Sequence, residues 1–115
     1  MKIKIYIFPD IFRYDEDDIY EENDLIVCDG VDTTPELVSV IDADDVKAAA
    51  SKIDRIVSSE LREIYNAPAR VNGGISLNKH LLSSLGVQDD YDYEITASVD
   101  FGYDSRTILI ALKCG

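Results

Sequence analysis

Apolar residues recur at intervals of three and four between positions 43 and 65. This spacing places them on one side of a helix and makes a continuous apolar stripe. Asp42 is a suitable N-cap for that helix, and Asn66-Ala67-Pro68 ends it. We therefore expect a long helix over about 43–65, packed against a sheet or a second helix. The stripe consists of Val46, Ala49, Ala50, Ile53, Ile56, Val57, Leu61 and Ile64.

Alternation of apolar and polar residues predicts strands on both sides of this helix. Residues 2–8 alternate, and Pro9-Asp10 is expected to end their strand. Residues 93–101 alternate with one wet face. Residues 107–112 are apolar on both faces, which is typical of an interior strand. A hairpin is expected to join the last two strands.

Shorter segments complete the predicted fold. Residues 25–28 form an apolar run typical of a short buried strand, and Asn72-Gly73-Gly74 is a turn signal. Thr34-Pro35 resembles a helix start, but residues 37–41 fit a strand equally well, so both alternatives stay open. A short helix is expected at about 78–85. The sequence thus predicts a single α+β domain over 1–115, with a mostly antiparallel sheet packed by one long and one short helix.

Most of the negative charge lies in an acidic segment at 10–36. This segment holds eleven carboxylates and one base, Arg13, so it contributes −10 of the formal net charge of −12. Seven of the acids fall within residues 15–24. In a helix, with a rise of about 1.5 Å per residue, they would present a negative charge every ~2 Å. Duplex DNA presents one every ~1.7 Å, so this segment is a candidate imitation of a phosphate backbone.

The chemistry of these residues suits a basic partner surface. Carboxylates pair with arginine and lysine, and tyrosine among carboxylates adds hydrogen bonds and cation–π contacts to arginine. Three further acids after the predicted short helix could join the same surface. The candidate partner-binding residues are Asp15, Glu16, Asp17, Asp18, Tyr20, Glu21, Glu22, Asp24, Asp89, Asp90 and Asp92.

The sequence offers little for catalysis. His80 is the only histidine and lies beside Leu81 in the predicted short helix, where a structural role is expected. Nothing near Cys28 marks it as an activated nucleophile. The acidic segment lacks EF-hand spacing, and two cysteines are too few for a structural zinc site. We therefore expect no enzymatic activity, no cofactor and no metal.

Charge and composition also limit location and partners. A net charge of −12 disfavours unaided binding to nucleic acid or to an anionic membrane. The chain has no apolar run long enough for a membrane span, and two cysteines do not make a disulfide scaffold. These features indicate a cytoplasmic protein with a basic protein partner.

Residues 70–113 combine Leu77 and Lys79 with a predicted short helix that ends in Leu85-Gly86-Val87, followed by a charged turn and two strands. In this pattern they resemble the swapped-hairpin domain of the SpoVT/AbrB and MazE-like antitoxin group. Asn78 stands where that family has proline, and few basic residues are present. This resemblance implies a dimer that binds DNA through Arg70 and Lys79. The residues in step with the family pattern are Leu77, Lys79, Leu82, Leu85, Gly86, Val87 and Asp90.

In composition, the whole chain is similar to phage-encoded DNA mimics, including anti-CRISPR and anti-restriction inhibitors. The first hypothesis is therefore a non-enzymatic acidic protein that occupies the nucleic-acid site of a basic DNA- or RNA-binding protein or nuclease. A DNA-binding regulator or antitoxin of the swapped-hairpin type is the first alternative. A small metal-dependent enzyme that uses the acidic segment is the second.

Overall fold

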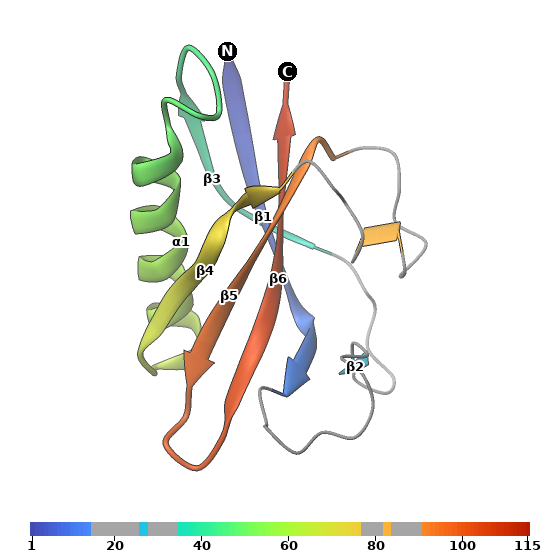
Figure 1. The fold of residues 1–115 in the computed structure, drawn as a ribbon, viewed down its shortest axis with the longest axis vertical. Coiled ribbons are helices and arrows are strands. Elements are labelled where there is room, and N and C mark those ends of the chain that lie inside the picture. Colours follow the sequence, from blue (N-terminus) through green and yellow to red (C-terminus); the bar gives the residue numbers. More distant parts are fainter. Residues whose placement is uncertain (15–25, 28–34, 77–81, 84–90) are drawn as a thin grey trace.

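Strands dominate the part of the chain that the computed structural model describes, namely residues 1–14, 26–27, 35–76, 82–83 and 91–115. At 10–14, 26–27 and 76 the description covers the backbone alone. One helix lies between the strands in chain order (Figure 1). The elements are β1 (Lys2–Tyr14), β2 (Ile26–Val27), β3 (Glu36–Asp42), α1 (Ala50–Tyr65), β4 (Ala69–Ser76), β5 (Tyr93–Asp100) and β6 (Ser105–Cys114).

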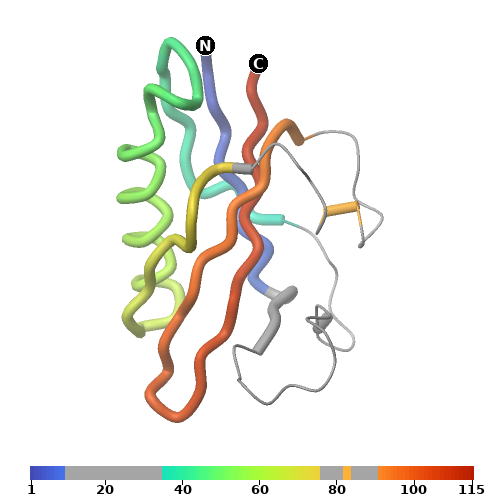
Figure 2. The backbone as a smooth tube through the Cα atoms, in the orientation of Figure 1, coloured from blue at the N-terminus to red at the C-terminus, as the bar shows by residue number. Residues whose placement is uncertain are grey.

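All described strand pairs are antiparallel and belong to one sheet. β6 lies at the centre, between β1 and β5, and β4 borders β5. Both β2 and β3 pair with the other side of β1. The two ends of the chain lie side by side (Figure 2), where the Gly115 N–H donates to the Lys2 carbonyl at 3.0 Å. The predicted α+β class, with a mostly antiparallel sheet and a long helix, is confirmed.

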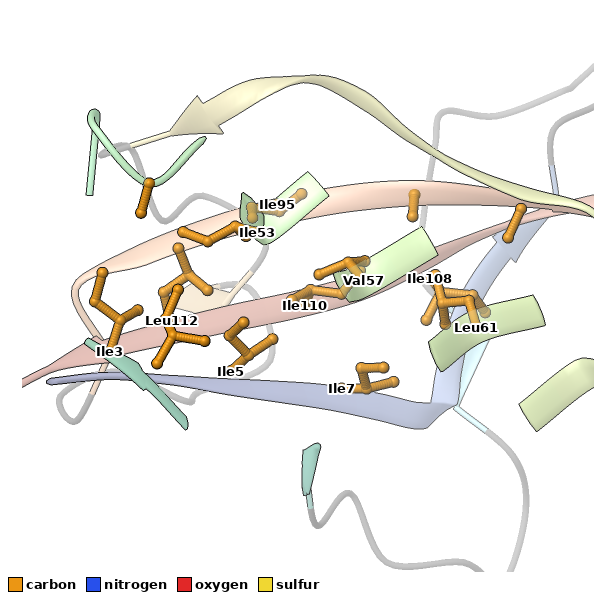
Figure 3. Packing of buried hydrophobic residues seen from close by; sticks show 14 of the residues in the cluster. Ile3, Ile5, Ile7, Ile53, Val57, Leu61, Ile95, Ile108, Ile110 and Leu112 are labelled. Atoms are coloured by element: carbon orange, nitrogen blue, oxygen red, sulfur yellow. The ribbon is translucent and has the colours of Figure 1, made fainter. Parts of the chain in front are cut away.

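The main core lies between α1 and one face of the sheet (Figure 3). Alternate residues of the strands point to this face, as the period of two in the sequence predicted. The helical stripe covers them through Ile53, Val57 and Leu61, each no more than 1% exposed. The strand residues of this core include Ile3, Ile5, Ile7, Ile95, Ala97, Val99, Ile108, Ile110 and Leu112.

A smaller apolar cluster covers part of the opposite face, which we call the open face. Phe8, Leu109 and Ala111 are buried there together with Leu82. The Tyr91 ring packs against this cluster, edge-on to Phe8 with 6.0 Å between ring centroids. Because β6 has apolar neighbours on both faces, residues 107–112 are all buried, and the prediction of an interior strand is confirmed.

The helix is shorter than predicted, because α1 begins at Ala50 and not near Ala43. Asp42 is the last residue of β3 and forms an exposed ion pair with Lys2 at 3.7 Å, so it is not the N-cap. The chain instead turns at 46–49, where Asp45 Oδ1 accepts a hydrogen bond from the Ala48 N–H. Propensity and charge favoured a helix start at Asp42, but this residue pairs with Lys2 in the β3–β1 register and belongs to the strand.

Two predicted breaks lie within strands. β1 continues past Pro9-Asp10 to Tyr14, with a register shift between Phe8 and Phe12 that absorbs the proline. The Tyr65 hydroxyl donates to the Pro9 carbonyl at 3.0 Å and ties this irregularity to α1. Likewise, Asn72-Gly73-Gly74 forms no turn between elements. It lies inside β4, where the register shifts before Ser76 and Gly73 adopts a φ of 63°.

The remaining predictions divide between confirmed and undescribed segments. Residues 36–42 are a strand, which resolves the alternative left open after Thr34-Pro35. The short strand expected at 25–28 appears as β2. α1 ends before Asn66, as expected, and the structure shows that Asn66 adopts the left-handed conformation. Most of the predicted helix at 78–85 lies outside the described residues, which include only Leu82 and Ser83 of it.

Candidate functional site

The predicted partner-binding residues fall almost entirely outside the described part of the chain. Only Asp92 is described. Its Oδ2 accepts a hydrogen bond from the Cys114 N–H at 2.7 Å, and its own N–H donates to the Leu112 carbonyl at 2.8 Å. Asp92 therefore fastens the end of β6 while remaining exposed. The undescribed candidates are Asp15, Glu16, Asp17, Asp18, Tyr20, Glu21, Glu22, Asp24, Asp89 and Asp90.

The charge of the protein divides unevenly between the two parts of the chain. The described residues hold twelve acidic and ten basic side chains, so they contribute −2 of the formal −12. The other −10 belongs to residues 15–25, 28–34, 77–81 and 84–90. The described sheet and helix are thus close to neutral, and most of the negative charge belongs to residues that the structure does not describe.

The described residues Tyr14 and Asp92 show where the undescribed acidic residues join the sheet. Asp15 follows Tyr14, which pairs with Arg106 of β6, whereas Asp92 lies beside Leu112 of the same strand. Six residues of β6 separate these levels, or about 20 Å at the usual rise of a strand. The two points where undescribed acidic residues join the sheet are therefore well separated along β6.

A buried carboxylate anchors the described residues 82–83 on the open face. Glu94 is only 6% exposed, and its Oε2 accepts a hydrogen bond from the Leu82 N–H at 3.1 Å. Leu82 itself is fully buried against Phe8 and Leu109. Sequence alternation placed Glu94 on a wet face. It gave no sign of the cover that Leu82 supplies.

The Cys114 thiol is half-buried next to this end of the sheet. Burial raises the pKa of the Cys114 thiol above its ordinary value of 9.0, and the negative charge of Asp92 raises it further. The N-terminal ammonium opposes both effects. A thiol with a raised pKa is a poor nucleophile at neutral pH, so Cys114 is not a catalytic candidate.

A hollow of about 470 Å³ lies on the open face, at the ends of β4 and β5 nearest the hairpin that joins β5 to β6. We call it the Arg70 pocket. Its lining is mainly polar and comes from three adjacent strands and the residue before β4. The sequence drew attention to Arg70 only as a basic residue and did not single out the others. The pocket is lined by Pro68, Ala69, Arg70, Ser98, Asp100 and Ser105.

Two absences are established for the described residues alone. Within them, no group of three histidine, cysteine, aspartate or glutamate side chains is placed to hold a metal ion. No helix among them is long and apolar enough to cross a membrane.

Searches with protein-family models, among curated proteins and among solved structures give no match.

Proposed function

We propose that this chain is a non-enzymatic acidic binding protein that occupies the nucleic-acid site of a basic DNA- or RNA-binding protein or nuclease. The uneven division of charge is the observation that supports the proposal. The described sheet and helix have almost no net charge, so their packing does not require the charge of the acidic segment. The crowded acids at 15–24 add like-charge repulsion without adding to the described core, so a cationic partner gives them a role.

The proposed mechanism is competition for one surface. Carboxylates of the acidic segment, joined by Asp89, Asp90 and Asp92, take the places of phosphates on the partner's arginines and lysines. Association between such charged surfaces is fast, and its rate constant falls steeply as ionic strength rises. The small number of cysteines supports a reducing, cytoplasmic setting for this encounter.

Charge-neutralising variants test the proposal directly. We expect Asp17→Asn, Asp18→Asn, Glu21→Gln and Glu22→Gln together to abolish capture of the partner from bacterial lysate at low salt. The matched control neutralises four acids of α1 and the turn before it, through Asp44→Asn, Asp54→Asn, Glu60→Gln and Glu63→Gln. It changes the net charge equally and should leave capture intact. Equal loss in both variants, or no loss in the first, would refute a role for the acidic segment.

The DNA-binding regulator remains the first alternative. One observation favours it, because Arg70 is exposed on β4 and its side chain has no hydrogen bond or ion pair to another described residue. The swapped-hairpin resemblance implies a dimer. Light scattering therefore separates the two proposals, since a monomer argues against the regulator. The metal-dependent enzyme predicts a thermal shift with calcium, magnesium or manganese.

A further inference from the structure

Two side chains of opposite charge line the Arg70 pocket without forming an ion pair with each other. Arg70 and Asp100 both line it, yet their side chains form no ion pair within 4.0 Å. Arg70 pairs with Ser98 in the β4–β5 register, and Asp100 lies two residues beyond Ser98 on the same strand. Such diagonal neighbours have Cβ atoms about 7–8 Å apart, which leaves room for a small group between the two charges.

Backbone contacts hold the two charged walls in place. The Asp100 N–H donates to the Pro68 carbonyl at 2.9 Å, so the end of β5 is tied to the residue before β4. Asp100 Oδ1 accepts a hydrogen bond from the Gly102 N–H at 2.8 Å. This bond fixes the carboxylate, whose second oxygen accepts no hydrogen bond from the described residues. The pocket is therefore preorganised on its acidic side.

Hydroxyl groups line the space between the charges. Ser98 Oγ lies 2.9 Å from Nδ2 and 3.1 Å from Oδ1 of Asn72, which holds the serine in one orientation. Ser105 pairs with Asp100 across the β5–β6 hairpin and adds a second hydroxyl. A hydroxyl both donates and accepts hydrogen bonds, so Ser105 suits a ligand that has both kinds of polar atom, whereas the Ser98 hydroxyl is already bonded to Asn72.

We propose that the Arg70 pocket binds a small zwitterion of the α-amino acid class. The carboxylate of the ligand lies on the Arg70 guanidinium, and its ammonium group lies on Asp100. A purely anionic ligand meets the repulsion of Asp100, and a purely cationic one meets that of Arg70. The volume of about 470 Å³ falls within the roughly 300–1,000 Å³ of small-molecule pockets. This inference is independent of the proposed function, because it uses none of the acidic segment.

An NMR titration of the full chain tests the inference. L-Alanine, L-serine and L-aspartate are the probes, added one at a time while backbone amide signals are followed. We expect at least one probe to shift the signals of Arg70, Ser98 and Gly102. The N-acetyl derivative of that probe lacks the ammonium group and the amide derivative lacks the carboxylate, so each should bind at least roughly tenfold more weakly.

Two variants and a matched control complete the test. Arg70→Gln and Asp100→Asn remove one charge each and should each weaken binding by at least roughly tenfold. Asn at position 100 can still accept the Gly102 hydrogen bond, so the loop is kept. Arg55→Gln on α1 should bind as the parent does. The inference is overturned if no probe shifts these signals, if either derivative binds as well as its parent, or if the pocket variants behave like Arg55→Gln.

Discussion

The carboxylate of Glu94 and the backbone N–H of Leu82 form a buried hydrogen bond of 3.1 Å on the open face. The bond joins β5 to a residue twelve positions earlier in the chain. It lies beside the cluster of Phe8, Leu109 and Ala111, away from bulk water. Because a buried donor without a partner is costly, this contact fixes the described residues 82–83 on the sheet.

Glu94→Ala should lower the free energy of unfolding by about 1–3 kcal/mol, because the Leu82 N–H loses its acceptor in a buried place. Glu94→Gln keeps an acceptor oxygen and should cost less. Urea denaturation followed by circular dichroism measures both. Glu63→Gln, an exposed acid on α1, is the control and should have little effect. Equal stability of Glu94→Ala and the parent would contradict an anchoring role.

Leu61→Ala should be among the more damaging core substitutions. Leu61 is fully buried between α1 and the sheet, and truncation of such a side chain typically costs about 2–5 kcal/mol. Ile64→Ala lies on the same helix at a side chain that is 42% exposed, and should cost about 0.5 kcal/mol or less. Thermal unfolding of the two variants gives the comparison. A similar loss in both would mean that the helix does not pack through the Leu61 side.

The two glycines of β4 should respond differently to alanine. Gly73 has a φ of 63°, so Gly73→Ala should cost about 1–2 kcal/mol even though no atom lies near the added Cβ. Gly74 also has open space, but its φ lies outside the left-handed region. Gly74→Ala should therefore be neutral or slightly stabilising. If chemical denaturation shows equal losses, the bulge is not at Gly73.

The raised pKa of Cys114 predicts how stability changes at alkaline pH. Since folding favours the neutral thiol, its contribution is fully present below the unfolded-state pKa of about 9. It is lost as pH rises through the higher pKa of the folded state. In a Cys28→Ser background, Cys114→Ser should remove this part of the decline. Asp92→Asn should lower the pKa and shift iodoacetamide alkylation of Cys114 to lower pH. An unchanged alkylation profile would contradict the role of Asp92.

Local sequence patterns predicted the helix and the strands whose apolar side chains are buried. The stripe of α1 and the alternation in β1 and β5 follow from one buried face, and the continuous apolar run of β6 follows from burial on both faces, so all three can be read from spacing alone. The positions of breaks cannot be read in this way. Glycine with positive φ serves a turn and a bulge equally well, and only pairing with β5 places Gly73 in a bulge. Pro9 likewise signals an end, yet β6 continues to pair beyond it.

The pocket and the buried acid depend on contacts between distant residues. Arg70, Ser98 and Ser105 come together only because three strands align in register. Glu94 is buried only because Leu82 covers it. Neither relationship leaves a local mark in the sequence. The acidic segment, by contrast, is evident from composition alone. The structure describes only one of the eleven predicted site residues, Asp92, and the other ten lie outside the described part.

The most direct test of the proposed function is affinity capture from bacterial lysate at low salt, with and without excess duplex DNA. We expect the captured proteins to bind nucleic acid and duplex DNA to displace them, because both ligands compete for one basic surface. Displacement is the informative part of the result. Captured proteins that are indifferent to DNA, or retention of DNA by the chain itself, would contradict the proposal that the acidic segment imitates a phosphate backbone.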